Sequence, residues 1–277
     1  MNVSELLFEL ASDERVAILY EVSSNPSRAS EIAHRLSATV QETARQLERL
    51  TEAKLISRDD ESRYRITTLG RLVLALLPSF KVIQDERDFF LSHDLSWLPP
   101  PFLHRLGELA EHRTITKLDE ALADAEETIK GAKKYVWLMS DQSIRQSFPH
   151  EHPAEVAFRF LLPKDIDSDT TQRLRTRIGP NLDIAKADQI KVSIVMNEKR
   201  AALYFPTLDG RMDLARGFAS EESAFHRWCE DLYTFYWGEA RAGHPQPGEP
   251  DPRLRNACHG GPAAVSGQHP RGAHRRR

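Results

Sequence analysis

One stretch of the sequence, residues 27–67, constrains the fold of this chain more than any other. Its pattern changes from helical spacing, through a polar break, back to helical spacing, and then to the alternation of short strands. The predicted elements are a helix over Ser30–Leu36 with Ser30 as its N-cap, a helix over Val40–Ala53, and strands over Lys54–Ile56 and Tyr64–Thr67. We therefore expect two short helices and a hairpin that pack into one small domain.

The helix predicted over Val40–Ala53 has an apolar and a polar side. Its apolar residues recur at spacings of four, three and three, which predicts one buried stripe: Val40, Ala44, Leu47 and Leu50. The polar side carries Gln41, Glu42, Arg45, Gln46 and Arg49. Such side chains reach base edges and phosphates when a helix lies in the major groove of DNA. The polar side is therefore a candidate DNA-contacting surface.

The predicted hairpin carries basic residues at its tip and edges, namely Arg58, Arg63 and Arg65. A helix, a break, a second helix and a hairpin are, in this order, the elements of a winged helix-turn-helix domain, in which the hairpin is the wing. We expect the arginines to hold the DNA backbone or the minor groove. The alternative is a winged helix that contacts only proteins, and the exposed Arg and Gln side chains favour DNA over it.

The charge of this predicted domain is nearly balanced. Residues 28–65 contain eight Lys or Arg and seven Asp or Glu, a net charge of +1. Because non-specific affinity for DNA grows with the number of phosphates neutralised, one such domain should bind DNA only modestly. A dimer doubles these contacts, so we expect a homodimer on double-stranded DNA.

Helices are also predicted on both sides of this stretch. Ser4–Val22 is rich in apolar residues and should form a packing helix. After the hairpin, Leu69–Leu77 is expected to end at Pro78, because proline lacks a backbone N–H and clashes with the preceding turn. Helical spacing resumes over Phe80–Leu91. These last two helices pair either with a second subunit or with the first helix of the same chain, and the pattern leaves both open.

Several stretches resemble a known family. LSATVQETARQLERLTEAKLI, followed by YRITTLGRLV, resembles the winged helix-turn-helix of ArsR-type archaeal regulators. HDLSWLP with LHRLGEL, and GFASEESAFHRWCEDLYTFYW, resemble archaeal regulators named for control of methanogenesis and filament formation. Members of that family join an ArsR-like winged helix to a characteristic middle domain. The resemblance implies an archaeal transcription regulator that consists of these two parts.

The remainder of the chain is predicted to form a mixed α/β domain. Three prolines at 99–101 mark its joint with the preceding helices. Helices are expected over Leu118–Ala132, Asp169–Ile178 and Ser220–Trp237, and strands over Tyr135–Ser140, Ala157–Leu162, Ile190–Met196 and Arg200–Phe205. The last two strands should form a hairpin. Together with the winged helix, these elements predict an α+β fold.

The last part of the chain, residues 241–277, differs from the rest in composition. Residues 241–277 contain seven Lys or Arg and two Asp or Glu, a net charge of +5, and have almost no large apolar residue to bury, so they should be disordered. The predicted divisions are a winged helix-turn-helix domain over 1–78, a helical linker with a proline-rich joint over 79–103, an α/β regulatory domain over 104–240, and a basic tail over 241–277.

Motifs for catalysis, cofactors and metals are absent from the sequence. It contains neither a glycine-rich nucleotide-binding motif nor the HExxH or GxSxG patterns of hydrolases. Cys229 and Cys258 have no zinc-ligand spacing and provide no disulfide framework. No apolar run approaches the roughly 20 residues that span a bilayer, and the acidic start is unlike a secretory signal. We expect a cytoplasmic protein without enzyme activity, cofactor, metal or membrane contact.

An effector site is predicted at the edge of the sheet. Ligands of open α/β sheets bind beyond the carboxyl ends of the strands. This points to Asp141, Lys164 and Asn197, provided that their strands run parallel. The chain is thus predicted to be a dimeric, sequence-specific transcription regulator with an unknown small-molecule or protein effector. A scaffold or sensor whose winged helix binds protein is the main alternative, and an enzyme fused to a DNA-binding module is the least favoured.

Overall fold

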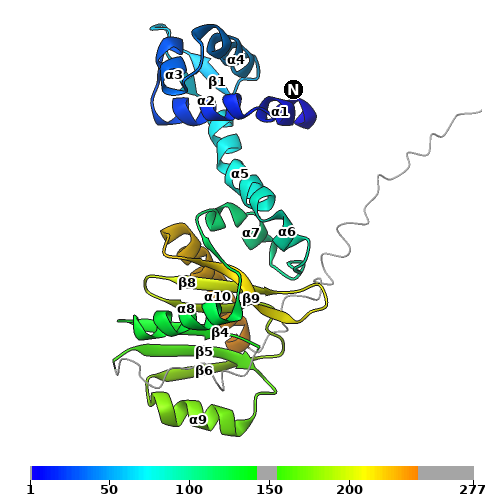
Figure 1. Ribbon diagram of the computed structural model, residues 1–277, viewed down its shortest axis with the longest axis vertical. Helices are drawn as coiled ribbons and strands as arrows, with labels where there is room; N and C mark the ends of the chain where they lie inside the picture. The colour runs from blue at the N-terminus through cyan, green and yellow to red at the C-terminus, as the bar shows by residue number, and fades with distance from the viewer. Residues whose placement is uncertain (1, 142–154, 243–277) are drawn as a thin grey trace, which may run out of the picture.

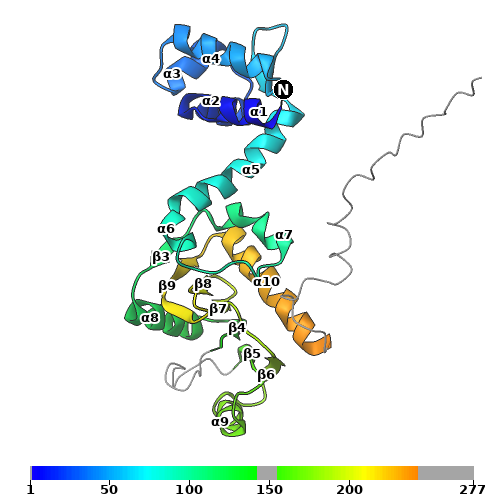
Figure 2. The same ribbon diagram turned by 90° about the vertical axis from the view of Figure 1, so that its right-hand side faces the viewer.

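A computed structural model describes residues 2–141 and 155–242 of the chain. Figures 1 and 2 show a helical domain with a small hairpin at one end, a sheet domain at the other, and a long helix, α5 (Thr68–Asp85), between them. This is the predicted α+β arrangement, with the winged helix-turn-helix domain first. The predicted basic tail lies outside the described residues, apart from Arg241 and Ala242.

The winged helix consists of α1 (Val3–Leu10), α2 (Asp13–Ser24), α3 (Ala29–Arg35), α4 (Val40–Glu52), β1 (Ile56–Arg58) and β2 (Tyr64–Ile66). β1 and β2 pair antiparallel and form the wing. Leu19 of α2, Ile32 of α3 and Leu47 of α4 are buried together in its core. Because burial of such side chains stabilises a fold by about 1.5–3 kcal/mol each, this core holds α3 and α4 in place on α2.

Two predicted helix boundaries in this domain are wrong. The single helix over Ser4–Val22 is in fact α1 and α2, because the Ser12 hydroxyl accepts a hydrogen bond from the Arg15 N–H at 3.4 Å and starts a second helix. Ser30 lies inside α3 rather than at its N-cap. The N-cap residue is Arg28, and its backbone N–H donates to the Glu31 carboxylate at 2.8 Å, which is the reciprocal half of a capping box.

Helix α5 continues through Pro78, so the prediction that a helix ends there is wrong. Proline removes one backbone hydrogen bond from a helix, but tertiary packing compensates at this position. The short helix η1 (Leu106–Leu109) packs on α5, and the Gly107 N–H donates to the Ser79 Oγ at 3.0 Å. α5 is therefore one continuous helix from the wing to the sheet domain (Figure 1).

The second domain is built on a seven-stranded sheet with the order β3-β9-β8-β7-β4-β5-β6. Its strands are β3 (Arg113–Ile115), β4 (Tyr135–Met139), β5 (Ala157–Pro163), β6 (Leu182–Ala187), β7 (Ser193–Asn197), β8 (Ala201–Pro206) and β9 (Met212–Ser220). β4, β5 and β6 run parallel, and the neighbouring pairs from β4 to β3 are antiparallel. The β7–β8 hairpin is confirmed, whereas β3, β6 and β9 are strands that the sequence pattern does not predict.

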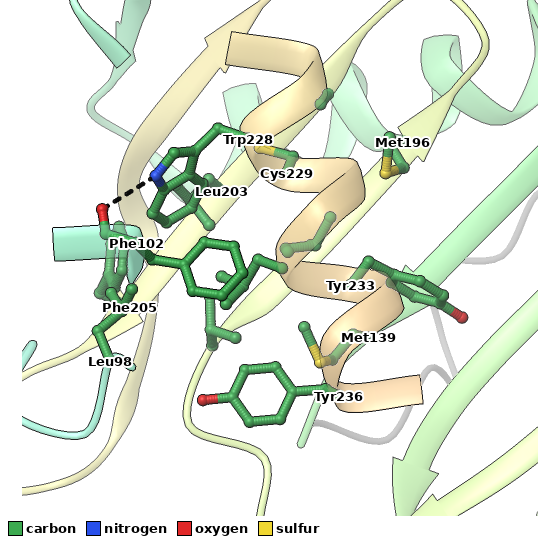
Figure 3. Close-up of a cluster of buried hydrophobic side chains, with 14 of the residues drawn as sticks. Leu98, Phe102, Met139, Met196, Leu203, Phe205, Trp228, Cys229, Tyr233 and Tyr236 are labelled. Carbon is green, nitrogen blue, oxygen red and sulfur yellow. Dashed lines mark hydrogen bonds between the residues drawn. The ribbon is translucent and has the colours of Figure 1, made fainter. Parts of the chain in front are cut away.

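Helices cover both faces of this sheet. α8 (Leu118–Lys130) and α9 (Ser168–Ile178) pack on one face, and α10 (Ser223–Ala242) packs on the other. The aromatic side chains of α10 fill the core on its face, as Figure 3 shows for Trp228 and its neighbours. The Trp228 Nε1–H donates to the carbonyl oxygen of Phe102 in α7 (Pro100–Leu103) at 3.2 Å. This bond holds the proline-rich joint on the sheet domain.

Four aromatic rings in mutual contact join the segment after α5 to the sheet. Phe89 of α6 (Arg87–Phe90) stacks on His93 with ring centroids 3.7 Å apart and contacts Phe218 of β9 at 4.6 Å. Phe218 also contacts the His112 ring at 4.4 Å. The His112 Nε2 lies 3.1 Å from the Glu86 Oε1, directly after α5. The ring series therefore ends at the helix that leads back to the winged helix.

We expect Gly107→Ala to lower the free energy of unfolding by about 1–3 kcal/mol, the usual cost of overpacking. A Cβ at this position would lie 2.9 Å from both the Pro78 Cβ and the Ser79 backbone nitrogen. Urea denaturation measures the effect. Gly238→Ala in α10 is the matched control, because an added Cβ there meets nothing within 4 Å and alanine favours a helix. Equal responses of the two variants would contradict the close approach of η1 to α5.

Candidate nucleic-acid interface

Helix α4 is the second helix of the helix-turn-helix and presents the candidate DNA-contacting surface. The turn before it contains Ser37 in a left-handed conformation, with φ of 53°. The Thr39 hydroxyl then accepts from the Glu42 N–H at 3.2 Å and starts the helix at Val40. The first turn of α4 therefore lies on the surface with its backbone N–H groups directed away from the helix, where the helix dipole favours negative charge.

The buried side of α4 differs from the predicted stripe. Its buried residues are Thr43, Gln46, Leu47 and Leu50. Leu47 and Leu50 agree with the prediction, but Val40 is 53% exposed and Ala44 is exposed as well. The prediction that Val40 and Ala44 are buried is wrong because the helix is rotated toward α1 and α2, which cover part of its polar side.

A buried arginine of α2 accounts for this rotation. Arg15 is 6% exposed, and its guanidinium donates to three acceptors from other segments. These are the Glu9 carbonyl at 2.6 Å, the Phe8 carbonyl at 2.8 Å and the Gln46 Oε1 at 3.1 Å. Arg15 thus satisfies carbonyls at the end of α1 and holds Gln46 of α4 in the interior. The prediction that Gln46 lies on the exposed face is wrong.

Arg49 is also drawn toward α1. Its Nη2 and Nε lie 2.7 and 3.2 Å from the two oxygens of the Glu9 carboxylate. The hydrogen bond from Arg49 holds the pKa of Glu9 below its usual value. The guanidinium also lies over the Phe8 ring, 5.2 Å from its centroid. Arg49 is half-exposed. To contact DNA, its guanidinium would have to bind a phosphate or a base in addition to the Glu9 carboxylate or in place of it.

The exposed polar face of α4 is consequently narrower than predicted. Gln41 and Arg45 face solvent, and the Arg45 side chain is 69% exposed. Arg45 Nη2 lies 2.8 Å from the Glu42 Oε1, and its hydrogen bond, with a second one from Gln46, keeps the pKa of Glu42 low. Glu42 is thus an ionised partner of its neighbours. Its predicted contact with DNA stays a prediction, as do those of Gln41, Arg45 and Arg49.

The wing places its arginines on the surface next to carboxylates. Arg65 Nη2 lies 2.9 Å from the Asp59 Oδ2, and Arg63 Nη2 lies 2.7 Å from the Glu61 carboxylate. A backbone hydrogen bond from Arg63, followed by the Arg65 side chain, lowers the pKa of Asp59. Arg58 lies over the Tyr64 ring at 5.8 Å. Because exposed ion pairs contribute little, a phosphate can replace these carboxylates at small cost.

Helix α5 carries an apolar stripe that remains exposed in this chain. Leu69, Leu72, Leu76, Phe80 and Ile83 follow each other at spacings of three, four, four and three, and all are exposed. On α1, Val3, Leu7 and Phe8 are exposed too. Packing within the chain accounts for Val73, Leu74 and Val82 of α5, which are buried, but leaves the stripe uncovered.

The predicted effector residues do not lie together. Asp141 and Lys164 follow the carboxyl ends of the parallel strands β4 and β5, and Lys164 Nζ lies 2.7 Å from Asp188 Oδ1. Asn197 lies at the opposite edge, because β7 runs antiparallel to β4 and pairs Asn197 with Val136. The prediction that places Asn197 with the other two is therefore wrong.

Asn197 has a structural role in the β7–β8 turn. Its amide donates to the Thr128 carbonyl at 2.7 Å, and its Oδ1 accepts from the N–H groups of Lys199 and Arg200 at 2.8 and 3.0 Å. The side chain is buried, and these three bonds satisfy it. Asn197 therefore holds the turn on α8 rather than facing a ligand.

Two hollows open at the end of the sheet where Asn197 and the β7–β8 turn lie, and no sequence pattern predicts either of them. One, of ≈ 380 Å³, includes His112, Arg113, Arg200 and Glu221 in its lining. The other, of ≈ 540 Å³, includes Glu198, Glu221, His226 and Arg227. Arg113 and Arg200 both contact the Asp124 Oδ1, while burial raises the pKa of that carboxyl. No sequence motif marks these residues, because they come from β3, the β7–β8 turn and the start of α10.

Within residues 2–141 and 155–242, no three His, Cys, Asp or Glu side chains lie where they could hold a metal ion together. Over the same ranges, none of the helices combines the length and the apolar character needed to cross a bilayer.

By its fold, the first part of the chain is a winged helix-turn-helix domain, and α5 connects it to the α/β domain. A family model described as the HVO_A0261 N-terminal domain matches residues 4–87, which comprise the winged helix and α5. No curated protein matches the sequence.

The chain has a remote likeness to several solved structures. TrmBL2, an archaeal chromatin protein described with a novel mode of DNA binding, is 11% identical, with a TM-score of 0.36 over 80% of this chain and 90% of that chain. An IclR homologue from Microbacterium sp. strain HM58-2 is 12% identical, with a TM-score of 0.24 over 84% and 98%. CalO1, a methyltransferase in calicheamicin biosynthesis, is 13% identical, with a TM-score of 0.25 over 65% and 61%. Likeness at this level supports no conclusion about the function of this chain.

We expect Arg15→Ala to lower the free energy of unfolding by about 1–3 kcal/mol, because it leaves the buried Gln46 Oε1 and the part-buried Glu9 carbonyl without their donor. Urea denaturation followed by circular dichroism measures the loss. Arg71→Ala is the matched control, since Arg71 is exposed on α5. A loss no larger than that of the control would show that Arg15 does not hold α1 on α4.

Proposed function

We propose that this protein is a transcription regulator whose winged helix binds double-stranded DNA. The observation that carries the proposal is the exposed first half of α4, where Gln41 and Arg45 face solvent. Glutamine and arginine at this position of a helix-turn-helix can pair with adenine and guanine in the major groove. The arginines of the wing, on the surface of the same domain, supply backbone contacts.

The α/β domain is proposed to sense an effector rather than to catalyse a reaction. The hollow that His112 lines offers a site for a small molecule, and His112 contacts Glu86 at the end of α5. A ligand that displaces His112 would therefore change the support of the helix that carries the winged helix. Asp141 and Lys164, at the opposite edge, stay predicted alternatives. The resemblance to archaeal methanogenesis and filament regulators with an ArsR-like winged helix supports this division of roles and a place in the cytoplasm.

A homodimer is part of the proposal. The stripe on α5 is one continuous apolar face, and a second copy can cover it with an identical stripe about a twofold axis. Such pairing would bring two winged helices to one DNA site. It would also double the number of arginine side chains that α4 and the wing can place on phosphates.

A protein-binding winged helix is the second candidate function, and the charge of the wing favours it. Its three arginines, Arg58, Arg63 and Arg65, are matched by Asp59, Asp60 and Glu61. A neutral wing attracts DNA weakly, because phosphate contacts dominate non-specific affinity. Binding to duplex DNA at two salt concentrations therefore separates the candidates.

We expect full-length protein to bind the duplex upstream of its own coding sequence more tightly than a scrambled duplex, and Arg45→Ala to lower that affinity about ten-fold with altered base preference. Fluorescence anisotropy at two salt concentrations measures both. Arg173→Ala on α9 is the matched control, since it removes an exposed arginine far along the chain from the winged helix. If the wild type binds neither duplex, the protein-binding candidate takes precedence.

We also expect Leu76→Glu to convert the dimer to monomers, because it places a charge in the centre of the apolar stripe. Sedimentation velocity measures the oligomeric state. Lys81→Glu places the same side chain elsewhere on α5, where Lys81 pairs with Asp85 in an exposed position, and should leave the dimer intact. A wild-type protein that sediments as a monomer at micromolar concentration would reject the dimer.

A further inference from the structure

Two apolar side chains interrupt the polar surface at the start of α4. Val40 is 53% exposed, and Ala44 is exposed one helical turn further on. Residues one turn apart lie above each other on a helix, so they form one small apolar patch. Gln41 and Arg45 lie beside it at the same one-turn spacing. The exposed face of α4 therefore begins with a row of methyl groups next to a row of hydrogen-bonding groups.

The charges along α4 indicate which end approaches DNA. Glu48 and Glu52 are exposed further along the helix and would repel phosphates. The opposite end carries the positive pole of the helix dipole, and the carboxylate in its first turn, Glu42, is paired with Arg45. In helix-turn-helix proteins the N-terminal residues of the second helix contact the base edges. Val40 and Ala44 thus occupy the half of α4 that is suited to enter the groove.

Only one of the four bases presents a methyl group in the major groove, and that base is thymine. We propose that Val40 and Ala44 contact thymine 5-methyl groups and thereby select T·A pairs next to the bases contacted by Gln41 and Arg45. This inference rests on the proposed function and names the base class that α4 recognises. Contacts from Gln41 and Arg45 alone would specify only the bases that these two side chains touch. The adjacent T·A pairs would remain unspecified.

The apolar patch of α4 is distinct from the stripe on α5. Its two residues are flanked by a long amide and a guanidinium, both solvent-exposed. The α5 stripe consists of five large apolar residues in a seam. A patch of two small side chains buries too little area for a stable protein interface, whereas one methyl contact per base is enough for recognition.

The test uses duplexes that the full-length protein selects from a random pool. Each thymine of the selected duplex is replaced in turn by deoxyuridine, which removes only the 5-methyl group. We expect one or two positions at which wild-type affinity falls about three- to five-fold, the effect of removing one buried methyl group. At the sensitive position, a pair with 5-methyl-deoxycytidine should bind more tightly than the unmethylated cytosine pair.

Two variants assign the effect to the patch. Val40→Ala and Ala44→Ser should bind the thymine duplex more weakly and should lose sensitivity to deoxyuridine at one position each. Val40→Thr keeps the shape and the helix propensity of valine and serves as a control for folding, checked by circular dichroism. Deoxyuridine in the sequence that flanks the selected motif is the matched control on the DNA.

Each outcome has one meaning. Selection that yields no preferred duplex would overturn the proposed function itself. Specific binding with no effect of deoxyuridine at any position would overturn the thymine contact and leave the proposed function intact. Equal sensitivity in the wild type and in both variants would show that another residue contacts the methyl group.

Discussion

The guanidinium of Arg15, together with the core residues Leu47 and Leu50, determines which side of α4 faces solvent, and the candidate interface depends on it. A charge that is taken out of water is tolerated only where hydrogen-bond acceptors surround it. Arg15 finds them in the last carbonyls of α1 and in the side-chain oxygen of Gln46. α1 is thereby held against α4, and Glu9 is placed where it can pair with Arg49. The surface left exposed on α4 is what remains after these contacts are made.

Helix α5 connects that surface to the rest of the molecule. Its buried side packs on the winged-helix core at one end and on η1 at the other, while its exposed side carries the apolar stripe. After α5, the rings of Phe89, Phe218 and His112 fix the connector to β9. One helix therefore relates three surfaces: the α4 face, the stripe proposed to pair subunits, and the hollow beside His112. These surfaces are thus connected by a packed helix rather than by a loose linker.

Residue patterns were sufficient to locate part of the candidate site. The period of α4 and the turn before it predict the helix, and Gln41 and Arg45 lie on its exposed face as expected. Gln46 was misassigned because its partner, Arg15, lies 31 residues away in the chain, and no local pattern reveals such a contact. Asn197 was misassigned because strand direction is decided by pairing across the sheet. In β9, Gly217 makes room for the Tyr204 ring, which hides the strand from a pattern based on large alternating residues.

By itself, the sequence determined the α+β fold and the main elements of the winged helix, but not β3, β6 and β9, because helix periodicity, turn residues and alternating strands depend on neighbours along the chain. Only the tertiary structure decided which partner covers each face. It showed that α1 covers part of α4 and that α5 continues through Pro78 beneath η1. It also showed that β7 runs antiparallel to β4, which places Asn197 at the end of the sheet opposite to Asp141. The physical reason is that periodicity defines which residues share a face, whereas burial and hydrogen bonding between distant segments define what that face meets.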